Sequence, residues 1–129
     1  MVDRQHPRPT DAELAILRVL WQRGPSTVRD VHEELNRDGA TGYTTILKLL
    51  QIMTEKGHVV RDETERAHVY EARYSEQKTQ RQLLSDLADR AFGGSAAKLV
   101  MQALSGRKAT AEELGVIREF LDRLEGDAR

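Results

Sequence analysis

The sequence predicts a mainly α-helical protein with a small β-hairpin, organised as a winged helix-turn-helix followed by a three-helix dimerisation segment. Apolar residues recur at helical spacing in several stretches, which glycines and capping sequences separate from one another. Two short β-prone runs follow the third stretch, and the strand pattern ends at Tyr74. We therefore expect a winged helix-turn-helix domain at residues 1–74 and a helical dimerisation domain at residues 75–129.

The first helix is expected to begin after Thr10. Thr10 and Glu13 have the spacing of a capping box, in which a hydroxyl and a carboxylate bind two N–H groups that lack helical partners. Gly24-Pro25 should end this helix, because proline cannot continue it. Its buried stripe is predicted to contain Leu14, Ile16, Leu17, Leu20 and Trp21.

A second helix should follow directly, capped by Ser26 or Thr27. Its apolar positions recur every three or four residues, and we expect it to end near Gly39. These positions are Val28, Val31 and Leu35.

The third helix is predicted to run from about Gly42 to Lys56 and to end at Gly57. At about 100° per residue, its apolar and polar side chains fall on nearly opposite faces. The apolar face contains Ile46, Leu49, Leu50 and Met53, and the polar face contains Thr44, Lys48, Gln51 and Glu55. The runs HVVRD and AHVYEA then predict a hairpin, joined by the charged link Glu63-Thr-Glu-Arg66.

Three further helices are expected after Ser75, Ser95 and the second capping box at Thr110. Gly93-Gly94 should end the first of them and Gly106 the second. These helices are too short to enclose their own apolar side chains, so a second copy of the segment is the expected partner.

Composition restricts the classes of function. Lys and Arg nearly balance Asp and Glu, giving a net charge of −1, so DNA binding would depend on local placement of cations. Zero cysteines exclude thiol chemistry and cysteine-ligated zinc sites, and we expect no cofactor or metal. The sequence displays no catalytic motif; the HEEL run at His32 lacks the second histidine of the zinc-protease motif. Without a long apolar run or signal segment, a cytoplasmic protein that does not insert into the membrane is expected.

The polar face of the third helix has side chains suited to DNA. Lys48 can donate to guanine and Gln51 can pair with adenine in the major groove. Backbone N–H groups and hydroxyls at the start of the helix favour phosphate. The predicted DNA-binding residues are Tyr43, Thr44, Thr45, Lys48 and Gln51, with Arg61 and Arg66 on the hairpin. Alternatively, this face is simply solvated and the chain is a winged-helix protein-interaction adaptor without sequence-specific DNA binding.

Five segments of the chain also follow one another in a recognisable order: DAELAILRVLW, STVRDVHEEL, YTTILKLLQIMTEKGHV, HVVRDETERAHVYEA and GGSAAKLVMQALS. Together, over Pro9 to Leu124, they resemble the three helices, wing and tail of the BlaI/MecI penicillinase-repressor family. The resemblance implies a non-enzymatic homodimeric repressor that binds a palindromic operator and dimerises through its C-terminal helices.

The same resemblance implies a mode of induction. In the antibiotic-responsive branch of the family, a membrane sensor metallopeptidase leads to cleavage of the repressor in its C-terminal region. The matching region here is around Met101-Gln102-Ala103, which lacks the Asn-Phe pair of staphylococcal members. The chain also lacks the cysteine pairs of copper-responsive relatives.

Overall fold

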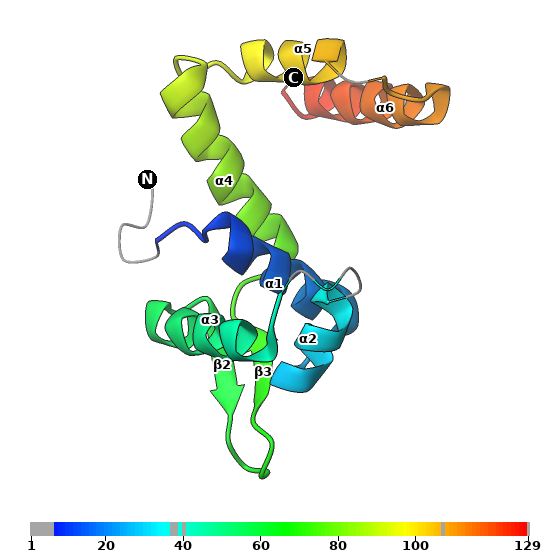
Figure 1. The fold of residues 1–129 in the computed structure, drawn as a ribbon. Coiled ribbons are helices and arrows are strands. Elements are labelled where there is room, and N and C mark those ends of the chain that lie inside the picture. Colours follow the sequence, from blue (N-terminus) through cyan, green and yellow to red (C-terminus); the bar gives the residue numbers. More distant parts are fainter. Residues whose placement is uncertain (1–6, 37–38, 40, 107, 129) are drawn as a thin grey trace. The chain divides into compact units, whose positions relative to one another are not determined.

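The structure, a computed structural model, describes residues 7–36, 39, 41–106 and 108–128. The chain divides into two compact units, Met1–Leu84 and Ser85–Arg129. Their boundary lies inside helix α4 (Glu76–Ala91), further along the chain than the expected boundary at Tyr74. The first unit contains α1 (Asp11–Arg23), α2 (Val28–Leu35), α3 (Tyr43–Lys56) and a small sheet (Figure 1).

Capping boxes begin the first two helices. At α1, the Glu13 N–H donates to Thr10 Oγ1 at 3.2 Å and the Thr10 N–H donates to Glu13 Oε1 at 2.8 Å. Thr27 and Asp30 make the same pair of bonds at α2. The predicted start of α1 and its end before Gly24 are confirmed. Helix α2 ends at Leu35, earlier than the expected end near Gly39, because Asn36 already leaves the helical conformation.

Helix α3 has the predicted bounds, with Gly42 before it and Gly57 after it. Gly57 has a φ of 84°, the left-handed conformation that glycine adopts without a steric penalty. A Cβ at this position would lie 3.2 Å from Arg73 Nη1, the end of an exposed side chain that can move aside, so the cost of a larger residue comes mainly from its backbone conformation. This glycine therefore fixes the turn from α3 into the hairpin.

The predicted hairpin is present as β2 (Val59–Asp62) and β3 (Val69–Ala72). A third strand, β1 (Ser26–Thr27), pairs with β3 and gives the antiparallel order β1-β3-β2. Strand β1 was not predicted from the sequence, since two residues are too few to display an alternating pattern. The β2–β3 hairpin projects beyond the helices as a wing (Figure 1). Three helices and this sheet form a winged helix-turn-helix, which confirms the predicted fold class.

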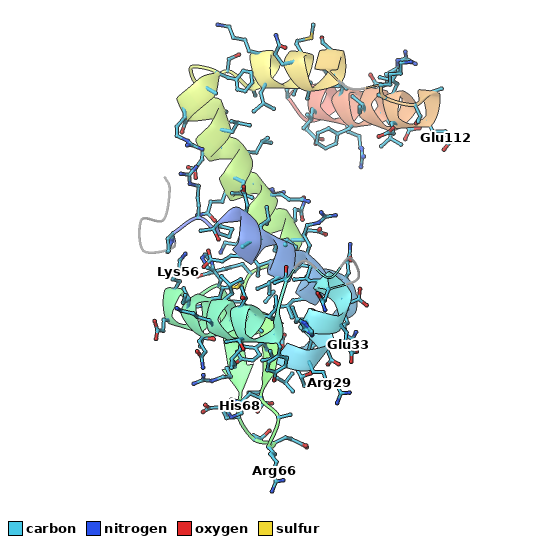
Figure 2. All side chains as sticks on the ribbon, in the orientation of Figure 1. Arg29, Glu33, Lys56, Arg66, His68 and Glu112 are labelled. Carbon is cyan, nitrogen blue, oxygen red and sulfur yellow. The ribbon has the colours of Figure 1, made fainter. Side chains whose placement is uncertain are left out.

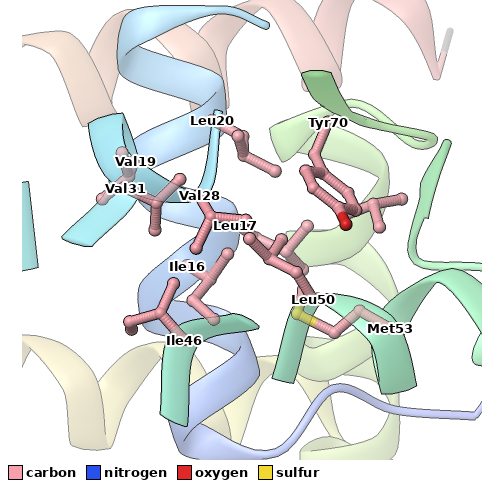
Figure 3. Packing of buried hydrophobic residues seen from close by; sticks show 11 residues of the cluster. Ile16, Leu17, Val19, Leu20, Val28, Val31, Ile46, Leu50, Met53 and Tyr70 are labelled. Carbon is pink, nitrogen blue, oxygen red and sulfur yellow. The ribbon is translucent and has the colours of Figure 1, made fainter. Parts of the chain in front are cut away.

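One hydrophobic core fills the space between α1, α2, α3 and the sheet (Figure 3). The buried apolar residues are Ile16, Leu17, Val19, Leu20, Val28, Val31, Ile46, Leu50, Met53, Val59 and Tyr70. Leu14, Trp21, Leu35 and Leu49, which were expected in the core, are only partly buried. Trp21 lies at the edge because its indole Nε1–H donates to the Tyr74 carbonyl at 3.0 Å, next to the start of α4.

The second unit contains α5 (Ala96–Gly106) and α6 (Ala111–Asp127), which begin at the predicted serine and capping box. None of the described residues of these two helices is buried within the chain. Large apolar side chains are therefore exposed on both, including Met101, Val116 and Phe120. Within the described parts of the chain, no helix has the length and apolar character needed to cross a membrane.

Candidate nucleic-acid interface

Helix α3 presents two faces of opposite character. Ile46, Leu50 and Met53 are at most 1% exposed and hold the helix against the core. The residues on the opposite side are exposed to solvent, as predicted: Thr44, Lys48, Gln51 and Glu55. Thr45, in the first turn, is exposed as well. In the described part of the chain, Lys48 makes no ion pair. The buried face thus fixes the direction in which Lys48 and Gln51 project.

The first turn of α3 is open to an anion. Gly42 precedes the helix, and no side-chain cap binds its first-turn N–H groups, in contrast to the capping boxes of α1 and α2. Uncapped N–H groups and the helix dipole together favour a phosphate. Tyr43 stands beside this turn, 48% exposed, and its ring meets the edge of His32 of α2 at a centroid distance of 5.8 Å. The contact joins the two helices of the helix-turn-helix.

A partly buried ion pair anchors the other end of α3. Lys56, the last residue of the helix, places its Nζ 2.9 and 3.0 Å from the two carboxylate oxygens of Glu13 on α1. Glu13 is only 2% exposed, and His58 Nε2 lies 3.9 Å from its Oε1. The backbone of His58 joins the same region, because its N–H donates to Met53 and its carbonyl accepts from Arg73. The Glu13 carboxylate therefore joins helix α1 to the end of α3, and His58 at the base of the wing lies beside it.

The environment of Glu13 favours its ionised form. Burial raises the pKa of the Glu13 carboxyl, but the hydrogen bond from Thr10 and the nearby Lys56 ammonium lower it by more. The pKa therefore lies below its ordinary value. An ionised Glu13 can then cap α1 and bind Lys56 at the same time.

The two wing arginines have different surroundings. Arg61 lies on β2, opposite Tyr70 on β3, and its Nη2 is 3.0 Å from Glu63 Oε1. Arg66 is exposed at the far end of the hairpin (Figure 2), and it makes no ion pair among the described residues. The structure therefore places five predicted residues on α3 and two on the wing, with only Arg66 extending freely from the tip.

Two features of this surface were not predicted from the sequence. The Glu13–Lys56 pair joins positions far apart in the chain, and no local pattern signals it. The Arg61–Glu63 pair could have been found, because opposite charges two residues apart at the end of a predicted strand lie within reach of each other. Within the described residues, no cluster of His, Asp or Glu is arranged to hold a metal ion.

Comparison with known families gives one match over most of the chain. Residues 9–123 match the model of the family described as "Penicillinase repressor". The chain is 32% identical over 117 residues to "Transcriptional regulator BlaI" of Mycobacterium tuberculosis, covering 89% of this chain and 83% of that protein. It is 22% identical over 116 residues to "Penicillinase repressor" of Bacillus licheniformis, covering 90% and 91% of the two chains.

Solved structures agree in the winged region. The DNA-binding domain of the repressor BlaI superposes with a TM-score of 0.50 and 26% identity, covering 59% of this chain and 90% of that one. The monomeric form of Bacillus licheniformis BlaI in complex with the blaP half-operator gives the same TM-score and identity, covering 60% and 92%. A MarR family protein from Bacillus stearothermophilus also has a TM-score of 0.50, at 18% identity over 92% of this chain and 74% of that one, which is a likeness of fold alone.

Proposed function

Because this chain belongs to the penicillinase repressor family, we propose that it is a transcriptional repressor that binds operator DNA in the cytoplasm. It acts without catalysis or a cofactor. The observation that carries the proposal is the exposed polar face of α3, held in place by a buried face on the opposite side. The complex of the similar BlaI chain with a half-operator supports the use of this domain for DNA.

In the proposed complex, α3 enters the major groove. Lys48 and Gln51 contact base edges, while the open first turn with Tyr43, Thr44 and Thr45 binds a phosphate. Arg61 and Arg66 of the wing contact the flanking phosphates. Base contacts give the sequence preference, and the phosphate contacts fix the position of the domain on the duplex.

We further propose that the repressor is a homodimer on a palindromic operator. Helices α4, α5 and α6 expose large apolar residues that a single chain leaves in water, among them Leu87, Met101, Val116, Phe120 and Leu124. Apolar groups of this size on neighbouring helical turns are typical of a protein interface. A symmetric pair of chains would cover them and present two α3 helices to two half-sites.

Titration of duplex DNA tests the function itself. The probe is a duplex covering the region upstream of this chain's own gene, and a scrambled duplex of equal length and composition is the comparison. A repressor should bind the first more tightly by at least about a thousandfold at physiological salt. Equal affinity for the two duplexes, or no binding, would instead support the protein-interaction adaptor.

Release from DNA is proposed to follow cleavage within α5, in a pathway that a membrane sensor metallopeptidase starts. The region around Met101 is helical, and a protease binds extended backbone, so this helix must open before it is cut. Mass spectrometry of the protein from induced cells should reveal a break between Phe92 and Ser105. An intact chain under full derepression would contradict cleavage while leaving DNA binding unaffected.

A further inference from the structure

Arg61 emerges from the inner side of the wing. Alternation along β2 places its side chain on the same face as buried Val59, two residues earlier, whereas Val60 between them is 56% exposed on the other face. Its register partner Tyr70 is 1% exposed. The Arg61 side chain is accordingly only about one third exposed, at 32%. This placement limits the directions that its guanidinium can take.

The guanidinium has a partner on the same hairpin. Arg61 Nη2 lies 3.0 Å from Glu63 Oε1. The backbone on both sides of Glu63 is held by Asp62, whose Oδ1 accepts from the Thr64 N–H at 2.9 Å and from the Thr64 hydroxyl at 2.8 Å. Strand pairing fixes Arg61 and this turn fixes the chain around Glu63, so little additional ordering is needed to form the ion pair.

The wing is acidic for a surface expected to approach DNA. From the start of β2 to the end of β3 it carries Arg61 and Arg66 but also Asp62, Glu63, Glu65 and Glu71. An arginine that is already bound to a carboxylate adds little net charge to such a surface. To bind a phosphate, Arg61 must exchange Glu63 for a phosphate oxygen or hold both anions side by side, and either arrangement weakens the contact.

We propose that Glu63 lowers the DNA affinity of this protein by competing with the phosphate backbone for the Arg61 guanidinium. This inference rests on the proposed function and adds a residue that opposes binding. Phosphate contacts are sequence-independent, so Glu63 weakens operator and unrelated DNA to the same extent. The carboxylate thus limits occupancy of the many non-operator sites without changing which bases are read.

The test compares two variants that remove the same charge from the same hairpin. Glu63→Gln removes the partner of Arg61, and Glu65→Gln removes an exposed carboxylate that makes no ion pair among the described residues. The intact protein is titrated with the upstream duplex and with its scrambled form at several salt concentrations. Both variants gain affinity through reduced long-range repulsion, which salt screens.

Glu63→Gln should gain about two- to fivefold more affinity than Glu65→Gln, on both duplexes alike. Its salt dependence should steepen by roughly one unit per subunit, because a released guanidinium now neutralises a phosphate. In an Arg61→Ala background, the two glutamine substitutions should have equal effects, since the competition needs the guanidinium.

Three results would overturn the inference. Equal gains from the two variants would mean that Glu63 acts only through net charge. A larger gain from Glu63→Gln that persists in the Arg61→Ala background would mean that its effect bypasses Arg61. If the unaltered protein does not prefer the upstream duplex, the proposed function fails first, and that failure is visible before any variant is compared.

Discussion

Lys48 and Gln51 are the two side chains expected to read bases, since both are exposed on the face of α3 that points away from the core. Lys48→Ala or Gln51→Ala should weaken operator binding by about 1–3 kcal/mol. Each should also relax discrimination at one base pair of each half-site, because the hydrogen bond to that base is lost. Titrations with operators that carry single base-pair changes measure both effects.

Arg18→Ala is the matched control for Lys48→Ala. Arg18 is an exposed cation on α1, outside the proposed interface, so its loss changes net charge equally without removing a base contact. Identical titration curves for the two variants would mean that Lys48 contributes only bulk charge. If Gln51→Ala also left discrimination unchanged, the exposed row of α3 would not be the reading face.

Glu13 is the residue on which the stability of the winged unit should depend most strongly in acid. Glutamine can keep the hydrogen bond that caps α1, so Glu13→Gln removes mainly the charge that binds Lys56. The free energy of unfolding should fall by about 1.5–3 kcal/mol at neutral pH. Urea unfolding followed by circular dichroism over a pH series measures it.

The pH dependence has a definite sign. Folding lowers the pKa of Glu13 from its ordinary value of 4.5, so its contribution is fully present above that value. The contribution is lost as the pH falls from there through the lower folded pKa. The difference between the natural protein and Glu13→Gln should therefore shrink below about pH 4. Asp11→Asn removes an exposed acid from the same helical turn, and it should change neither the free energy of unfolding nor its pH dependence appreciably. If the natural protein and Glu13→Gln differ in free energy of unfolding by the same amount at every pH, the charge of Glu13 does not have this role.

At the level of whole elements, the wing should contribute sequence-independent affinity through its tip. Arg66 is exposed at the end of the hairpin, and we expect it to contact a phosphate beside the groove rather than a base edge. Arg66→Ala should weaken operator and scrambled DNA alike and reduce the salt slope by roughly one unit per subunit. Arg118→Ala on α6 removes an exposed charge far along the chain and should leave the slope unchanged. A selective loss on the operator alone would assign Arg66 to base reading.

Elements whose limits depend on neighbouring residues were predictable from the sequence. The capping boxes at Thr10 and Thr110 and the end of α3 at Gly57 were predicted from local signals, and the structure confirms all three. Strand β1 and the Glu13–Lys56 pair were not predictable, because each exists only after distant segments meet. The apolar periodicity of α3 predicted which of its residues face solvent. The contacts of these residues with DNA stay a prediction.

For the molecule as a whole, the structure changes where a separable DNA-binding unit should end. Thr79 of α4 is only 4% exposed, and Trp21 binds the Tyr74 carbonyl just before that helix. The first compact unit continues to Leu84, so a chain cut after Tyr74 would lose packing that a chain cut after Leu84 keeps. We therefore expect residues 1–84 to fold alone as a monomer.

The full chain should be a dimer, and the dimer should account for most of its operator affinity. Once one winged unit of the dimer binds its half-site, the linked unit is held near the second half-site at a high effective concentration. Residues 1–84 alone lack this link and should bind the operator about 10²–10⁴-fold more weakly. Sedimentation at micromolar concentration measures the assembly, and titration of whole and half operators measures the affinity.

Leu124→Asp in the full chain places a charge on the exposed apolar face of α6, and it should give a monomer with the weak binding of the short chain. If the natural full chain is monomeric, or if Leu124→Asp leaves it dimeric with unchanged affinity, the exposed face of α6 does not join the two copies.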